Sequence, residues 1–370
     1  MLNAEPTLRS AAPEVRTCPM CPVCGGTDVQ IRFADCRDLL FAAPGEFRVA
    51  ECAACEALFC DPRITADQFD TYYLASYYPT AEQIRARLRA KRFTRWALRR
   101  FWGPAARDTA ARRGARRIVS LFSIQLRMAP PVQGAGRLLE VGCSSGEKLF
   151  LLRDCGWQAE GIEPSSDAHA EAEKLGLPAQ RCPLEDADLP NGAYDVIQLT
   201  HVLEHLIDPV GCLLKLRDAL APGGKILLTL PNGHGLGLRL FGRYWQGLDL
   251  PRHCVVYTPR ALRALCSRVG LEVRQVRNLV SPEAIVGSMK FTLNALRSNA
   301  RCANAPCADA RPSVSPGGAE RCGSRYQPDR KLKNFAGRLA RKAIAAALLP
   351  AALLGRGEVM QIELARADRA

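Results

Sequence analysis

From Arg137 onward, short apolar runs alternate with longer stretches in which apolar residues recur every three or four positions. Runs of this length predict buried strands, and the longer stretches predict helices. The predicted strands cover 137–143, 159–164, 194–200 and 225–232, and the predicted helices cover 146–157, 165–176 and 209–224. Strands that alternate with helices are typical of a doubly wound α/β fold, a parallel sheet with helices on both faces.

The pattern is less regular beyond this unit. A helix over 258–270 and a strand over 271–278 are predicted next. The polar stretch 298–323 has no apolar periodicity, so we expect a mobile loop. The run 358–366 is predicted to return as a last strand at the edge of the sheet.

The sequence contains no pattern typical of membrane insertion or export. Its longest apolar stretch, 343–355, is shorter than the roughly 20 residues that span a bilayer and contains Pro350, so we expect a packed or interfacial helix. The N-terminus lacks the charged-then-apolar pattern of a signal peptide. We therefore expect a cytoplasmic protein without a transmembrane segment, and leave peripheral membrane contact open.

Cysteine spacing predicts a metal site near the N-terminus. Two pairs share the Cys-x-x-Cys spacing: Cys21 with Cys24, and Cys52 with Cys55. Each such turn aims two thiolates at one tetrahedral ion, so the pairs predict a closed, structural four-thiolate zinc site. Short alternating runs over 29–33 and 47–52 suit the strands of a zinc ribbon. Cys18 could replace Cys21 or Cys24 as a ligand, and plain reduced thiols are the alternative.

Basic residues are concentrated in one segment. The formal net charge of the 370 residues is +14, and between Arg85 and Arg117 thirteen Lys or Arg face the single acid Asp108. Apolar residues recur here at roughly helical intervals and predict an amphipathic helix: Ile84, Leu88, Trp96 and Phe101. A solvated basic face, an anionic substrate or membrane surface, and RNA are all open interpretations of this segment.

These patterns together predict four segments. We expect a zinc-ribbon-like domain over 18–80, a basic helical linker over 81–130 and the α/β core over 131–280. The remaining residues, 281–370, would hold the insertion, a helix and the last edge strand.

The carboxyl ends of the first two predicted strands suit a nucleotide-type ligand. In doubly wound sheets the ligand lies beyond these ends. Gly142 and Gly146 frame the turn after the first strand, where glycine lets the backbone approach a ligand closely. Glu163 follows the second strand at about the spacing at which an acid accepts hydrogen bonds from ribose hydroxyls.

Four stretches in order, "LLEVGCSSGEKLFLL", "GIEPS", "YDVIQLTHVLEHLIDP" and "LAPGGKILLTLPN", resemble the motifs of class I S-adenosylmethionine-dependent methyltransferases. The resemblance covers roughly Arg137 to Asn278, and "CPVCGG" with "CAAC" resembles the zinc ribbon that precedes this domain in some bacterial members. It implies S-adenosyl-L-methionine as cofactor. The implied neighbours are Glu140, Gly142, Cys143 and Gly146 for the methionine end, Glu163 for the ribose, Leu184 and Glu185 for the adenine, and Thr200 with His201 for the sulfonium. Ser144 stands where family members often have glycine.

The stretch "HVLEHLIDP" contains His-x-x-Glu-His, an arrangement also found in one class of zinc metallopeptidases. Asp208 and Pro209 predict that a helix begins there, which leaves only a short turn and argues against a peptidase. In a helical turn His201, Glu204 and His205 would share one face. Ubiquinone-type O-methyltransferases, which this segment resembles, carry acids and a histidine here and are thought to bind a divalent ion. Metal assistance is therefore one hypothesis, and simple hydrogen bonding of the turn is the other.

Methyl transfer to oxygen or nitrogen usually needs a base, and histidine titrates near neutral pH. The catalytic candidates are His201, His205 and His253, each of which could instead be structural. We expect a methyltransferase that acts on a small-molecule, sugar or lipid-linked acceptor, at oxygen or nitrogen rather than carbon. An RNA methyltransferase that uses the ribbon and basic helix, and a non-catalytic scaffold of the same fold, are the alternatives.

Overall fold

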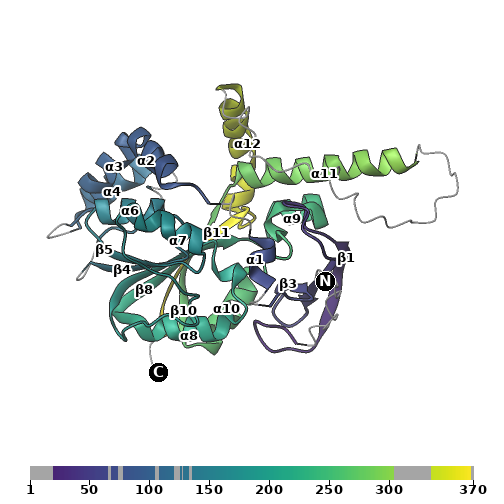
Figure 1. Ribbon diagram of the computed structural model, residues 1–370, viewed down its shortest axis with the longest axis horizontal. Coiled ribbons are helices and arrows are strands. Elements are labelled where there is room, and N and C mark those ends of the chain that lie inside the picture. Colours follow the sequence, from purple (N-terminus) through teal and green to yellow (C-terminus); the bar gives the residue numbers. More distant parts are fainter. Residues whose placement is uncertain are drawn as a thin grey trace, which may run out of the picture.

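The structure, a computed structural model, describes residues 20–65, 68–73, 78–104, 108–120, 126, 128–132, 136–303 and 335–367. Within them the chain forms a four-stranded sheet near its N-terminus and a seven-stranded sheet that carries most of the helices (Figure 1). Cys18 and residues 304–323 of the expected loop lie outside the described residues.

The seven-stranded sheet has the order β10-β11-β8-β7-β4-β5-β6. Its strands are β4 (Arg137–Val141), β5 (Gln158–Ile162), β6 (Ala179–Gln180), β7 (Tyr194–Thr200), β8 (Leu220–Pro231), β10 (Leu271–Leu279) and β11 (Val359–Arg366). The five strands from β8 to β6 are parallel, and β11 is antiparallel to both of its neighbours. The predicted doubly wound α/β sheet is therefore confirmed.

The expected edge position of the last strand is wrong. The run 358–366 does return as β11, but β11 lies between β8 and β10, and β10 forms the edge. Ile362 and Leu364 of β11 are buried and face an apolar core, while Gln361 and Glu363 alternate with them. A strand that is buried on one face gains more from an interior place in the sheet than from an edge, because both rows of backbone groups are then paired.

Two helix boundaries also differ from the prediction. The helix expected over 209–224 ends at Ala219 as α8 (Pro209–Ala219), since the chain is extended from Leu220 and continues as β8. Residues 298–303, expected in a mobile loop, are the last turns of α11 (Pro282–Ala303).

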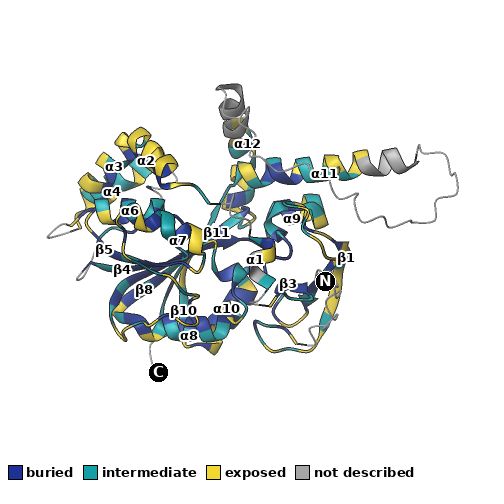
Figure 2. Ribbon diagram, in the orientation of Figure 1, coloured by how far each residue is buried: buried dark blue, intermediate teal, exposed yellow. Residues whose placement is uncertain are grey.

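Helices cover both faces of the parallel strands (Figure 1). α6 (Glu147–Asp154) and α7 (Ser166–Glu173) lie over one face, and α8 and α10 (Pro259–Arg268) lie over the other. Alternate strand residues serve the two cores: Leu138 and Val196 pack with α6, whereas Leu139 and Ile197 pack with α8 and α10. Figure 2 shows these central strands buried almost throughout.

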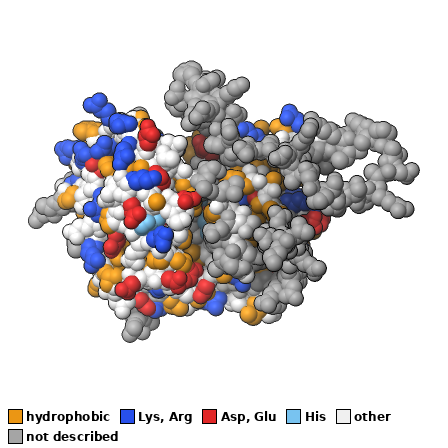
Figure 3. Space-filling view, viewed as in Figure 1, with side chains coloured by type: hydrophobic (Ala, Val, Ile, Leu, Met, Phe, Trp, Pro, Cys, Tyr) orange, Lys and Arg blue, Asp and Glu red, His pale blue; other side chains and the backbone are white. Residues whose placement is uncertain are grey.

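The basic segment is a broken helix rather than a continuous one. It consists of α2 (Ala81–Ala90), α3 (Arg92–Ala97), the π-helical turn η3 (Leu98–Trp102) and, further on, α4 (Ala110–Val119). Ile84 and Leu88 are buried as the periodicity predicts, but Trp96 is 54% exposed. Lys and Arg gather on the surface over these helices (Figure 3).

Many of these cations are paired within the protein. Arg95 and Arg99 both bind Asp154, at 2.9 Å and 2.5 Å, and Arg116 binds Asp108 at 2.6 Å. The segment therefore presents less unpaired charge than its sequence suggests.

The remaining helices are short or C-terminal. They are α1 (Phe69–Tyr72), α9 (Leu236–Phe241), α12 (Phe335–Leu353) with Pro350 inside it, and the 3₁₀ turns η5 (Leu203–His205), η6 (Gly242–Tyr244) and η7 (Gln246–Leu248). Among the described residues, no helix combines the length and the apolar character that crossing a bilayer requires.

The N-terminal sheet has the order β1-β2-β3-β9. Three strands come from the ribbon: β1 (Val29–Cys36), β2 (Phe47–Cys52) and β3 (Leu58–Asp61). The fourth, β9 (Val255–Val256), comes from the loop between β8 and α10 and pairs with β3 through Leu58 and Phe59. The ribbon and the core thus share one sheet and one apolar cluster.

A buried ion triad holds this junction. Arg252 is 1% exposed, and its guanidinium donates to both oxygens of Asp38, at 2.7 Å and 3.0 Å, and to Asp249 at 2.6 Å. Its charge also lies 4.8 Å from the ring centroid of Phe41. A buried cation of this kind depends on its carboxylate partners, because without them it would be left unpaired in the interior.

We predict that Asp38→Ala lowers the free energy of unfolding by about 3–5 kcal/mol, because it leaves the buried guanidinium half-paired. The control is Glu46→Ala, which removes the Arg37–Glu46 pair, whose two side chains are both 70% exposed. That change should cost less than about 1 kcal/mol. Urea unfolding at pH 7 measures both, and equal effects of the two variants would contradict the prediction.

Candidate functional site

The glycine turn after β4 adopts a conformation that only small residues tolerate. Gly142 and Gly146 have φ of 67° and 87°, in the left-handed region. A Cβ on Gly142 would approach Val202 Cγ2 to 2.5 Å, and one on Gly146 would approach Leu177 Cδ1 to 2.3 Å. Larger side chains at these two positions would therefore displace the turn from the end of the sheet.

Ser144 adopts the left-handed conformation that glycine would adopt more readily, with φ of 51°. Its backbone N–H donates to Glu163 Oε2 at 2.8 Å, and the N–H of Ser165 donates to Glu163 Oε1 at 3.0 Å. Glu163, which is 4% exposed, therefore joins the loop after β4 to the loop after β5. Burial raises the pKa of Glu163. Each of its oxygens keeps a second lone pair for a ligand hydroxyl.

Glu140, Lys148 and Thr200 meet where β4 and β7 end. Lys148 Nζ donates to Thr200 Oγ1 and lies 3.5 Å from Glu140 Oε1. The other oxygen, Glu140 Oε2, is buried and has no hydrogen-bond partner among the described residues. Burial raises the pKa of Glu140 to about 7, against the opposing effect of Lys148, and burial lowers the pKa of Lys148.

A cavity of about 500 Å³ opens beside these residues. Its polar wall contains Arg87, Lys91, Glu147, Lys148 and Thr200, and its apolar wall contains Leu98, Met128, Ala129, Leu151 and Leu152. Glu147 pairs with both Arg87 and Lys91, so one carboxylate is shared by two cations. The volume suits a small molecule, and the excess of cations on the polar wall favours an anionic one.

The residues expected near the adenine lie further along the sheet. Leu184 is 3% exposed and belongs to the apolar core, whereas Glu185 is exposed and accepts a hydrogen bond from Cys212 Sγ at 3.4 Å. Cys143 is buried next to Gly161. A Cβ on Gly161 would approach the Cys143 sulfur to 2.6 Å. Close packing of the two loops thus accounts for Gly161.

The three histidines occupy different surroundings. His201 has φ of 55°, its side chain is 48% exposed, and its Nδ1 lies 3.1 Å from Glu204 Oε1. His205 and His253 stack edge to face with ring centroids 4.7 Å apart. Burial and the charge of His253 lower the pKa of His205 to about 4, so this ring is neutral at physiological pH.

Glu204 and the two stacked histidines form a compact group. Ligand atoms of Glu204, His205 and His253 all lie within 4.8 Å of one another. Glu204 belongs to the 3₁₀ turn η5, so no sustained helix presents the His-x-x-Glu-His residues as a peptidase would require. His253, from the loop before β9, takes the place in this group that the sequence predicts for His201.

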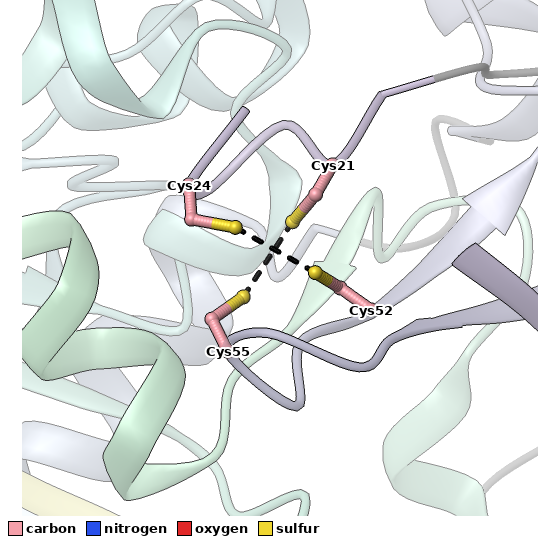
Figure 4. A group of neighbouring side chains, drawn as sticks. All are labelled: Cys21, Cys24, Cys52 and Cys55. Carbon is pink, nitrogen blue, oxygen red and sulfur yellow. Dashed lines mark hydrogen bonds between the residues drawn. The ribbon is translucent and has the colours of Figure 1, made fainter. Parts of the chain in front are cut away.

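Four cysteines converge from the two ribbon turns (Figure 4). Cys21 and Cys55 sulfurs are 3.6 Å apart, as are those of Cys24 and Cys52, and all four lie within 4.8 Å of one another. A tetrahedral zinc ion with Zn–S bonds of about 2.3 Å requires sulfur separations of roughly 3.8 Å, so the group fits this ion.

The two turns are built for thiolates. The Gly26 N–H donates to Cys24 Sγ at 3.4 Å, and a Cβ on Gly26 would approach that sulfur to 3.3 Å. The hydrogen bond between Cys21 and Cys55 lowers the pKa of the Cys21 thiol and raises that of the Cys55 thiol, so the two sulfurs share one proton.

The structure brings to these sites several residues that the sequence patterns do not predict. Lys148, Arg87 and Lys91 line the cavity, and Tyr73 contacts His205 Nδ1 at 2.6 Å. Of these residues, only Lys148 could have been suspected from the sequence, because it is a cation in the first turn after Gly146, on a helix with many apolar residues. Contacts from α2 and from residue 73 depend on tertiary packing and leave no local signal.

The residues at the glycine turn fit the cofactor that the resemblance implies. The partnerless Glu140 Oε2 can accept from the ammonium of a methionine moiety, and the turn leaves no side chain at Gly142 or Gly146 to block it. Glu163 can accept from a ribose diol.

Comparisons with known proteins agree with this geometry. A family model described as "Methyltransferase domain" matches residues 111–276. A ubiquinone biosynthesis O-methyltransferase from Cereibacter sphaeroides is 27% identical over 167 residues, which cover 42% of this chain and 67% of that protein. One from Bradyrhizobium diazoefficiens is 29% identical over 155 residues, covering 40% of this chain and 57% of that protein. A tRNA U34 carboxymethyltransferase from Azotobacter vinelandii is 34% identical over 111 residues, covering 28% of this chain and 35% of that protein.

We predict that Glu140 makes the ligand-free protein less stable as the pH rises. Its pKa is about 7 in the folded protein and 4.5 as the ordinary value, so the folded state holds the proton more tightly. The stabilisation of the folded state by this proton is fully present below about pH 4.5 and is lost as the pH rises through 7. A shift of this size corresponds to roughly 3 kcal/mol.

Urea unfolding of the wild type and Glu140→Gln between about pH 5 and pH 8 measures this effect. The difference in free energy of unfolding, wild type minus variant, should fall across the range. Glu46→Gln is the control and should parallel the wild type, because Glu46 is 70% exposed and pairs with Arg37, which does not titrate in this range. A constant difference between wild type and Glu140→Gln would show that Glu140 titrates normally.

Proposed function

Because residues 111–276 are a class I S-adenosylmethionine-dependent methyltransferase domain, we propose that the protein methylates an oxygen or nitrogen of a small anionic molecule bound in the cavity beside Lys148 and Thr200. The observation that carries this proposal is the cavity itself. Thr200, at the carboxyl end of β7, lines it, and so does Lys148, which contacts Glu140 of β4, so it lies next to the place where the cofactor's methionine end is expected.

The chain's own residues supply the cofactor half of the site. Glu140 receives the methionine ammonium through Oε2, and Gly142, Cys143 and Gly146 form the turn along that moiety. Glu163 receives the ribose, and Leu184 with Glu185 borders the adenine. When bound, the cofactor supplies an electrophilic methyl group on a sulfonium. A serine in place of glycine at position 144 is compatible with this site, because the hydrogen bond from its backbone N–H to Glu163 already fixes the turn.

The cavity supplies the acceptor half. Leu98, Leu151 and Leu152 receive an apolar body, and Arg87 with Lys91 attracts an anionic group. Lys148 lies between this wall and Thr200. An acceptor oxygen next to the Lys148 ammonium is stabilised as an anion, which is the form that attacks a methyl group.

This arrangement changes the expected roles of the histidines. His205 and His253 are held by backbone carbonyls, at 3.0 Å from Arg252 O and 2.8 Å from Gly247 O, and neither lines the cavity. His201 does not line the cavity either, but it is the exposed one of the three and directly follows Thr200, which does, so it is the histidine proposed to accept a proton from the acceptor.

The ribbon is proposed to hold a structural zinc ion through Cys21, Cys24, Cys52 and Cys55. All four positions are taken by protein thiolates, which leaves no open position for substrate. The bound ion would fix the ribbon turns and, through β3, the loop that contains β9.

RNA as the acceptor is the second candidate, favoured by the similarity to a tRNA-modifying enzyme and by the basic surface over α2 to α4. Pairing of Arg95, Arg99 and Arg116 with acids weighs against it. RNA binding that falls steeply with added salt would favour this candidate over a small acceptor.

The first test is calorimetric titration with S-adenosylhomocysteine. We predict micromolar binding to the wild type and at least a tenfold weaker affinity for Glu163→Ala, because the ribose loses its acceptor. Glu173→Ala, at an exposed carboxylate of α7, is the control and should bind as the wild type does. Circular dichroism establishes that each variant is folded. Absence of binding to folded wild type would support the scaffold alternative.

The second test concerns the acceptor. In a screen of small phenols and carboxylates, we predict that the double substitution Arg87→Met with Lys91→Met raises KM for anionic acceptors about tenfold or more and leaves the affinity for S-adenosylhomocysteine unchanged. Arg85→Met is the control, since Arg85 is on the same helix but binds Lys174 O. Equal turnover of anionic and neutral acceptors by the wild type would contradict the proposed acceptor class.

A further inference from the structure

A second cavity, of about 310 Å³, is unused by the proposed methyl transfer. It lies between α4, the segment 128–131 and one face of β8, β11 and β10. Met128 and Ala129 also line the first cavity, so this segment separates the two. The segment is held in place because Trp102 Nε1 donates to Ala129 O at 2.9 Å and Gln198 Nε2 donates to Met128 O at 3.2 Å.

The floor of the second cavity is a polar face of the sheet. Four of its side chains lie opposite one another in pairs on β10 and β11: Gln275 with Glu363, and Arg277 with Gln361. The other face of β11 is apolar and buried, as at Leu364. Strands in a sheet that is covered by helices are normally apolar on both faces. This polar face therefore suits water or a polar ligand rather than a packed helix.

Three arginines of α4 form another wall of the cavity. Arg113, Arg116 and Arg117 have helical spacing, so they share one face of α4. Asp108 binds Arg116 at 2.6 Å and lies 3.9 Å from Arg113, so it orients two of the three guanidiniums. The guanidinium of Arg117 has no hydrogen-bond or ion-pair partner among the residues that the structure describes.

Cations outnumber acids around the cavity. Its lining contains five Lys or Arg side chains and one acid, Glu363, which pairs with Lys225 at 3.3 Å. Like Arg117, Arg277 is exposed, and within the described ranges its guanidinium has no partner. Gln361 Oε1, next to Arg277 in the strand register, is buried and also lacks a partner there. The cavity thus brings together two unpaired guanidiniums, one from α4 and one from β10.

We propose that this cavity binds a phosphate dianion, either free or as the monoester of a small molecule. One guanidinium saturates a carboxylate through two parallel hydrogen bonds, whereas a phosphate has oxygens for two such partners. Two negative charges also match two unpaired cations better than one does. The volume is at the lower end of the range for small-molecule sites.

An ester would gain further contacts in this cavity. Trp102, Leu126 and Pro130 line it and offer apolar surface to an organic body. A hydroxyl group on that body would satisfy Gln361 Oε1, the buried oxygen without a partner among the described residues. The five cations are distinct from those of the first cavity, so the inference does not rest on the proposed methyl acceptor.

Calorimetric titration of the full-length protein tests the proposal, with inorganic phosphate and glycerol 3-phosphate as probes at about pH 8, where both are largely dianions. We predict a Kd below about 1 mM for at least one probe. Arg117→Met and Arg277→Met should each weaken binding about tenfold or more, because each removes a charge-assisted hydrogen-bond donor. Tighter binding of glycerol 3-phosphate indicates an ester as the ligand, and equal or tighter binding of inorganic phosphate indicates the free anion.

Two controls separate this cavity from other basic surfaces. Arg274→Met is the matched variant, because Arg274 is also on β10 but pairs with Glu272 and does not line the cavity. It should bind the probes as the wild type does. The double variant Arg87→Met with Lys91→Met removes cations of the first cavity and should also retain binding.

Arg117→Met and Arg277→Met should unfold in urea as the wild type does, because neither guanidinium has a described partner to lose. Absence of binding of both probes to folded wild type would overturn the proposal, even if an RNA oligonucleotide binds through the same arginines. Loss of probe binding in the double variant of Arg87 and Lys91 alone would assign the phosphate to the first cavity and overturn it as well. Absence of S-adenosylhomocysteine binding with probe binding intact would count against the proposed function and not against this cavity.

Discussion

The buried guanidinium of Arg252 is the contact on which the two halves of the molecule depend. It pairs with Asp38 of the ribbon and with Asp249 of the loop between β8 and α10. Separation of the ribbon from the core would therefore remove one of the two carboxylates that balance this buried charge. The backbone carbonyl of Arg252 also accepts a hydrogen bond from His205 Nδ1, and His253 is the next residue in the chain. The same residue thus joins the ribbon to the core through its side chain and holds the His205 ring through its backbone.

This junction gives the ribbon a purpose beyond its own stability. The Cys60 N–H donates to Cys254 O at 3.1 Å, and the Thr258 hydroxyl donates to Cys55 O at 3.4 Å, on either side of the β3–β9 pairing. The loop between β8 and α10 is therefore held near its C-terminal end by a strand and a turn formed much earlier in the chain. A loop held in this way can present histidines at fixed positions, which a free loop of the same sequence could not do.

Local patterns were sufficient for much of the fold and for part of the site. The strand at 194–200, the cysteine pairs and the glycine turn were all predictable, because periodicity and turn chemistry act over a few residues. The interior place of β11 and the approach of His253 to Glu204 were not, since both depend on which distant segments pack together. Lys148 lies between these cases: its position in the helix was visible, but its contact with Glu140 required the fold.

The place of β11 between β8 and β10 has a consequence for the order of assembly during synthesis. β10 touches the rest of the sheet through β11, so it has no strand partner until the ribosome has added Val359–Arg366. Until then β8 and β10 both present open backbone edges, which are sites of erroneous pairing with other chains. A nascent chain paused in the region between α11 and α12 would therefore be the form most in need of a chaperone.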